Sequence, residues 1–187
     1  MVVGDAAMNT PPSPANNLPL PQWAYVPGEM AEDDADHDTL WKAKSLVPSR
    51  FGDYVPARHP ALRYGIALND RGYFWESQEV LEAVWAAAPQ GGRERILLRA
   101  CILIANANLR LRIQKPHAAA RLLGEALQEL DALNARKATS AGDGFADGFP
   151  TVAMIDLLKD KLARPELTKA DWVAFRRLAE DETKCTL

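Results

Sequence analysis

The sequence contains few of the residues that build disulfide frameworks, metal clusters or strongly charged surfaces. Among its 187 residues are two cysteines, Cys101 and Cys185, and three histidines. Two cysteines are too few for a disulfide framework, which favours reduced thiols in a cytoplasmic protein. The 22 basic and 25 acidic residues leave a net charge of −3, so no bulk positive field attracts nucleic acid or anionic lipid.

Long apolar runs are also absent, and the amino-terminal stretch lacks the features of a signal peptide. No run of about 18 apolar residues occurs, so we expect no transmembrane span. The first twenty residues have neither a basic start nor an apolar centre, and six of the 13 prolines precede Gly28. We therefore expect a cytoplasmic protein whose residues 1–56 are extended or poorly ordered.

The sequence does contain enough apolar residues, 48%, for a sizeable core, and from Pro60 onward they recur at helical spacing. The expected helices cover residues 60–70, 73–87, 94–113 and 116–133. Pro60 and Pro116 suit the first turns of the first and fourth helices. The third helix is apolar on nearly every side between Ile96 and Ala105, which predicts a central, buried position.

The last fifty residues are predicted to form a linker and a pair of helices. Residues 138–150 are rich in glycine and form the linker, and residues 151–187 hold two amphipathic segments. The second segment begins at Thr168, whose spacing to Asp171 matches a capping box. The prediction is an all-α protein, a compact bundle of about four core helices within residues 57–137 plus the C-terminal helical pair.

An acidic cluster precedes the helices and at first suggests a calcium loop. Asp34, Asp36 and Asp38 alternate as such a loop requires. The sixth and twelfth positions, however, hold Thr39 and Ser45 in place of the required glycine and glutamate. We therefore interpret the cluster as a solvated acidic loop.

The helix over residues 73–87 carries the most informative polar side chains. At 100° per residue, Gln78 and Glu82 lie on one shoulder of its apolar stripe, and Glu76 and Glu79 point further toward solvent. Glu82 is thus the carboxylate that we expect to be partly buried. An ion pair with an arginine of a neighbouring helix and a chemical role both remain open for it.

The third expected helix carries a second polar stripe. Arg99, Leu103, Asn106 and Arg110 follow one another at i, i+4, i+7 and i+11. Asn106 lies in an apolar run, so we expect a buried amide that needs hydrogen-bond partners. If this stripe faces the preceding helix, the two share one polar patch. The candidate patch consists of Gln78, Glu79, Glu82, Asn106, Arg99 and Arg110.

Several short segments stand out together, namely residues 25–28, 72–76, 79–82 with Trp85, 104–107 and 118–123. In these segments the chain resembles the DUF309 family, over roughly residues 23–133. The resemblance implies a small helical protein of a family found in bacteria, archaea and plants without an established activity, and we expect a bacterial source. Some members are labelled as predicted metal-dependent hydrolases because of a histidine and carboxylates in the motif helix.

This chain departs from the family pattern at two positions. Gln78 stands where the family has histidine, and Leu103 stands where it has glutamine. An amide oxygen is a far weaker zinc ligand than an imidazole, and leucine cannot orient a ligand. The resemblance therefore implies a metal site that is lost or altered here. No cofactor is assigned, and a divalent metal held by Glu82 and Glu79 remains the alternative.

The favoured hypothesis is a non-catalytic module that binds a protein partner or a second copy of itself. The alternative is a metal-dependent, hydrolase-like or small-ligand site on the Gln78, Glu82 and Asn106 patch. Whether the protein is an enzyme stays open. Cations between Arg110 and Arg121 suit the last turn of a helix, so nucleic-acid binding is not expected, and neither is a membrane partner.

Overall fold

The computed structural model describes residues 18–138 and 142–175 and shows a bundle of α-helices. These helices are α1 His37–Lys44, α2 Pro60–Asp70, α3 Phe74–Ala87, α4 Arg93–Arg112, α5 Pro116–Asn134 and α6 Thr151–Leu162. Two 3₁₀ turns cover Glu32–Asp34 and Lys169–Asp171. The described residues contain no β-strand, which confirms the all-α prediction.

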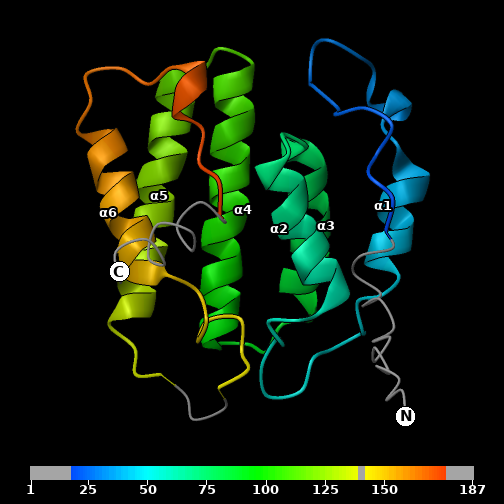
Figure 1. The fold of residues 1–187 in the computed structure, drawn as a ribbon, viewed down its shortest axis with the longest axis vertical. Helices are drawn as coiled ribbons and strands as arrows, with labels where there is room; N and C mark the ends of the chain where they lie inside the picture. The colour runs from blue at the N-terminus through cyan, green and yellow to red at the C-terminus, as the bar shows by residue number, and fades with distance from the viewer. Residues whose placement is uncertain (1–17, 139–141, 176–187) are drawn as a thin grey trace, which may run out of the picture.

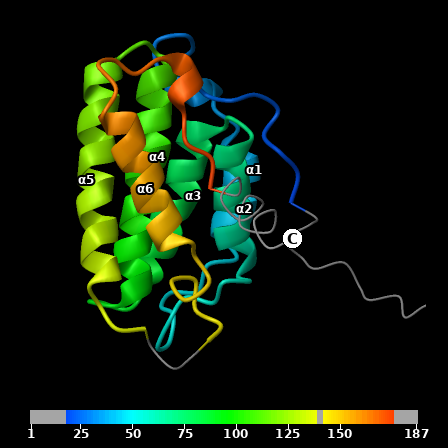
Figure 2. The same cartoon turned by 60° about the vertical axis from the view of Figure 1, so that its left-hand side comes forward.

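The helices form a row of packed neighbours with α4 near its middle (Figure 1). α4 packs against α3 on one side and against α5 on the other, and α6 packs against α5. α2 packs against α3, and α1 contacts both of them. Figure 2 shows the last described segment running between α6 and α2 in that view.

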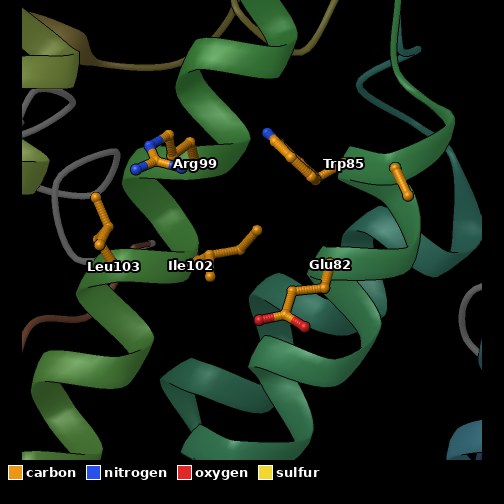
Figure 3. A pocket seen from close by; sticks show the side chains of 6 residues that line it. Glu82, Trp85, Arg99, Ile102 and Leu103 are labelled. Atoms are coloured by element: carbon orange, nitrogen blue, oxygen red, sulfur yellow. The ribbon is translucent and has the colours of Figure 1, made fainter.

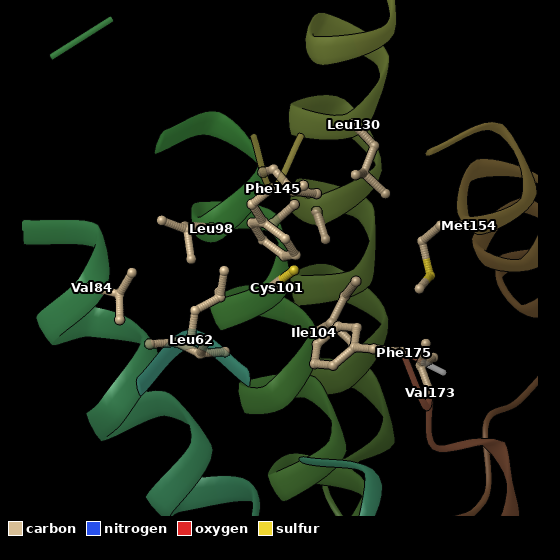
Figure 4. Packing of buried hydrophobic residues seen from close by; sticks show 14 of the residues in the cluster. Leu62, Val84, Leu98, Cys101, Ile104, Leu130, Phe145, Met154, Val173 and Phe175 are labelled. Carbon is tan, nitrogen blue, oxygen red and sulfur yellow. The ribbon is translucent and has the colours of Figure 1, made fainter. Parts of the chain in front are cut away.

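α4 is the buried centre of the core, as its apolar sequence predicts. Leu97, Leu98, Cys101 and Ile104 of this helix are 0% exposed, and Figure 4 shows several of them among side chains from other helices. Pro60 and Pro116 occupy the first turns of α2 and α5, as expected. No helix among the described residues is long and apolar enough to cross a membrane.

Residues 1–56 were expected to be extended or poorly ordered, but residues 37–44 of this stretch form the helix α1. Its amino end is capped by Asp36, whose carboxylate accepts hydrogen bonds from the Thr39 backbone N–H and hydroxyl at 3.2 and 2.9 Å. Part of the predicted acidic loop therefore serves as a helix cap. Leu40 and Ala43 bury the inner face of α1 in the core.

Of the predicted C-terminal helical pair, the first helix is α6. The described residues after Thr168 form a 3₁₀ turn followed by extended chain, and residues 176–187 of the second predicted segment lie outside the described residues. Thr168 and Asp171 are bonded to each other at the position of the predicted capping box: the Asp171 carboxylate accepts from the Thr168 N–H at 2.8 Å and from the Thr168 hydroxyl at 2.9 Å. Val173 and Phe175 are buried in the core, and Leu178 lies outside the described residues.

Candidate functional site

The three predicted polar residues of α3 point in different directions. Glu79 forms an ion pair with Lys44 of α1. Glu82 is solvent-exposed as a residue, although partial burial of its carboxyl group raises its pKa. The neighbouring Glu79 carboxylate raises this pKa further and Lys44 opposes it. Gln78 is half-buried, and none of the side-chain hydrogen bonds found among the described residues involves it.

The buried carboxylate of α3 is Glu76, which the sequence analysis wrongly placed toward solvent. Glu76 is 0% exposed, and its Oε1 accepts a hydrogen bond from the Tyr25 backbone N–H at 2.6 Å. Burial raises its pKa, while the Tyr25 hydrogen bond opposes the increase. The amino-terminal segment covers a helix face that a helical wheel assigns to solvent. Glu82, which was expected to be partly buried, is the more exposed of the two.

The polar stripe of α4 also differs from expectation at its amide. Asn106 is only half-buried, whereas Asn108, two residues later, is 0% exposed. No hydrogen bond among the described residues joins Asn106 to Gln78. Arg99 forms an ion pair with Glu129 of α5, with Nε and Oε1 2.8 Å apart. Arg110 lies half-buried in the last turn of α4.

A groove between α3 and α4 brings two of the six predicted patch residues together. Its volume is about 360 Å³, and Figure 3 shows the side chains that line it. The lining residues are Glu82, Trp85 and Ala86 of α3 and Arg99, Ile102 and Leu103 of α4. Gln78, Glu79, Asn106 and Arg110 of the predicted patch are not among them. The groove is therefore mainly apolar, with one acidic and one basic side chain.

Arg95, which the sequence analysis missed, holds one wall of this groove in place. Its guanidinium carbon lies 3.9 Å from the centre of the Trp85 ring. Its Nη1 donates to the backbone carbonyls of Trp85 at 2.8 Å and Ala88 at 3.1 Å, at the end of α3. Arg95 thus stacks on the tryptophan and satisfies helix carbonyls at once. Its position ten residues after Trp85, across a tight helix–helix turn, is the only sequence feature that suggests this contact.

Metal-ligand clusters, the cysteine and His59 bear on whether the described residues can carry out catalysis. No cluster of three or more His, Cys, Asp or Glu side chains near enough to hold a metal ion occurs in residues 18–138 and 142–175. Cys101 is completely buried, and burial raises the pKa of its thiol. His59 precedes α2 and packs edge-on against Phe51 with ring centres 5.0 Å apart; burial lowers its pKa.

Comparison with known protein families gives a match to the model described as "Domain of unknown function (DUF309)". The match covers residues 62–122, which run from the first turn of α2 to the middle of α5. It confirms the resemblance for this segment, and the wider span of residues 23–133 stays a prediction. No curated protein and no solved structure matches the chain.

Proposed function

We propose that this protein with a DUF309 segment is a non-catalytic helical module that associates with a second copy of itself through the α3–α4 groove. The supporting observation is the placement of Glu82 and Arg99 on opposite walls of an apolar groove. In a two-fold dimer the same surface meets itself, so residue i of one copy contacts residue j of the other. Glu82 of one copy can then face Arg99 of the other, so the two charges are complementary across the interface.

The apolar side chains of the groove favour binding of a second protein copy over catalysis. Trp85, Ile102 and Leu103 are all half-buried, so each keeps apolar surface that a partner can cover. Tryptophan and arginine are the residues most enriched at the energetic centres of protein interfaces. Leu103 adds apolar surface to the wall that α4 contributes to the groove. The Arg99 ion pair with Glu129 uses Nε, so its Nη groups can reach a further carboxylate.

Exchange of the two charges tests the dimer directly. We expect the wild type to show a concentration-dependent dimer in sedimentation equilibrium. Glu82→Arg and Arg99→Glu should each weaken it about tenfold or more, because each places like charges opposite one another across the interface. The double variant, Glu82→Arg with Arg99→Glu, should restore association, since the opposite charges then face each other again.

Two control variants separate the interface from the packing of a single chain. Glu129→Gln removes the intrachain partner of Arg99 and should leave the dimer intact. Val152→Glu changes a side chain on α6 that is 59% exposed and lies outside the groove, and it should have no effect. A wild-type protein that stays monomeric at all concentrations would refute the proposal. So would a double variant that associates no better than either single one.

A small-ligand site in the same groove is the second candidate. Its volume of about 360 Å³ lies within the range of small-molecule sites, roughly 300–1,000 Å³. The raised pKa of Glu82 favours a ligand that can donate a hydrogen bond to its carboxyl group. A monomeric wild type whose thermal midpoint rises with a small molecule, and does so less after Leu103→Glu, would favour this candidate over the dimer.

A further inference from the structure

Residues 18–26, which we call the strap, are bound to the helices through their backbone at every third residue. The hydroxyl of Tyr64 in α2 donates to the Pro19 carbonyl at 2.6 Å. The Gln22 N–H donates to the Asp36 carboxylate at 3.1 Å, and the Tyr25 N–H donates to the Glu76 carboxylate at 2.6 Å. Side chains of the helical part thus hold the main chain of an extended segment.

One side chain of the strap adds an aromatic contact. The Tyr25 ring packs edge-on against Trp75 of α3, with ring centres 4.8 Å apart. We call Asp36, Tyr64, Trp75 and Glu76 together the seat. Because most of its contacts reach backbone atoms, the seat is suited to extended peptides of varied sequence, as in other modes of peptide recognition.

The strap does not satisfy the seat completely. Glu76 is 0% exposed, yet its Oε2 has no hydrogen-bond partner among the described residues. A buried carboxylate normally accepts hydrogen bonds at both oxygens, and leaving one bare costs free energy. The Asp36 carboxylate nearby adds to the rise in the Glu76 pKa that burial causes. A ligand that brings a further hydrogen-bond donor to this oxygen satisfies Glu76 more completely than the strap does.

An acidic cavity next to the strap has the matching charge. Its volume is about 420 Å³, and Gln22 and Trp23 of the strap line it together with residues 33–38. Those residues include Asp33, Asp34, Asp36 and Asp38. The ion pairs found within the described part of the chain involve none of these four aspartates. A lysine or arginine at the position of Gln22 would therefore lie beside several carboxylates that have no ion-pair partner in the described chain.

The seat and the strap also differ in their relation to the matched family. Tyr64, Trp75 and Glu76 lie within residues 62–122, which match the family model. The strap lies outside residues 62–122, although its Tyr25 and Val26 belong to the residues that carry the resemblance in the sequence. It is therefore a segment laid over helices of the matched part, and the structure shows that this surface accepts extended chain.

We propose that the seat is a binding site for an extended peptide with a basic residue, and that the strap occupies it as an internal ligand until such a peptide displaces it. The peptide backbone takes the place of the strap backbone on Asp36, Tyr64 and Glu76. Its basic side chain enters the acidic cavity. This site is separate from the α3–α4 groove, so it stands whether or not the protein dimerises.

A strap-release variant makes the seat available without changing it. Gln22→Pro with Tyr25→Pro removes the two backbone donors, because proline has no N–H. The four seat residues stay unchanged. Hydrogen exchange of the remaining strap amides should rise in this full-length variant, while the exchange of α4 stays at the wild-type level.

Binding is then measured by fluorescence anisotropy with two labelled peptides of the sequence of residues 18–30. One peptide carries Lys and the other Glu in place of Gln22. We expect saturable binding of the lysine peptide to the release variant, and binding of the glutamate peptide at least about tenfold weaker. Adding Glu76→Gln to the release variant should weaken its binding of the lysine peptide. The wild type should bind it more weakly still, since the tethered strap competes at a high effective concentration.

The outcomes are decisive in either direction. A folded release variant without saturable binding refutes the site, and equal affinity for the two peptides refutes the basic preference. If the release variant does not fold, the wild type is tested by hydrogen exchange with excess lysine peptide. Faster exchange of residues 18–26 then supports displacement, and unchanged exchange refutes it.

Discussion

A single buried amide, Asn108, joins α2, α4 and the C-terminal segment. Its Nδ2 donates to Asn69 Oδ1 and to the Val173 carbonyl, both at 2.8 Å. Its Oδ1 accepts from the Val173 N–H at 2.8 Å. Both polar atoms of the side chain thus form hydrogen bonds, and these bonds offset the free-energy cost of burying an amide in an apolar core.

Replacing this amide should be costly, and the neighbouring asparagine provides the control. Asn108→Ala leaves the Val173 N–H buried without a partner, so we expect a loss of about 2–3 kcal/mol in the free energy of unfolding. Asn106→Ala removes a half-buried side chain and should change the free energy of unfolding by less than about 0.5 kcal/mol. Urea denaturation measures both. Equal losses would show that Asn108 contributes no more than its neighbour.

The residue scale is where prediction from sequence was weakest. A helical wheel assigns the buried face from the apolar side chains of a single helix, and it does not include contacts with distant segments. It therefore placed Glu76 in solvent, although Tyr25, 51 residues earlier, covers it. It placed the buried amide at Asn106, two residues from Asn108, because both lie in the same apolar run. Glu82 and Arg99, two residues of the candidate patch, line one groove, and both positions follow from helix spacing. The patch as a functional site stays a prediction.

At the scale of elements, α2 to α5 were predicted well because local features define them. Prolines open α2 and α5, and glycines with Pro89 separate α3 from α4. The segment 142–150, predicted as a linker, depends instead on distant partners. The Ala57 N–H donates to the Asp143 carbonyl and the Phe145 N–H to the Val55 carbonyl, each at 2.9 Å. Such pairing leaves no periodic trace in the sequence.

Gly144 in this segment should tolerate no larger side chain. A Cβ atom there would lie 2.6 Å from Glu94 Oε1 and 3.0 Å from Asp147 Oδ2, and both residues are largely buried. Gly144→Ala should therefore lower the free energy of unfolding by about 1–3 kcal/mol. Gly148→Ala is the control, because nothing lies within 4 Å of its added Cβ. Thermal unfolding of the pair compares them, and equal midpoints would contradict the predicted clash.

At the scale of the whole molecule, the contacts link parts that the sequence analysis treated as separate. The Phe175 N–H donates to Asp70 of α2 at 2.7 Å, and Asn69 donates to the Val173 carbonyl at 3.0 Å. Arg93 of α4 holds Asp147 of the predicted linker at 2.6 Å. These bonds are buried or partly buried, so breaking them exposes core surface on both sides.

We therefore expect residues 57–137 and the segments after them to unfold as one unit. Far-ultraviolet circular dichroism reports mainly on the long helices, and native-state hydrogen exchange resolves α6 from α4. Circular dichroism and tryptophan fluorescence should give coincident urea transitions, and the slowest amides of α6 and α4 should open with the same free energy. Independent domains joined by a flexible linker would instead let α6 exchange at lower denaturant than α4. That result would mean that the contacts of Asn69, Asp70 and Arg93 do not couple the two parts.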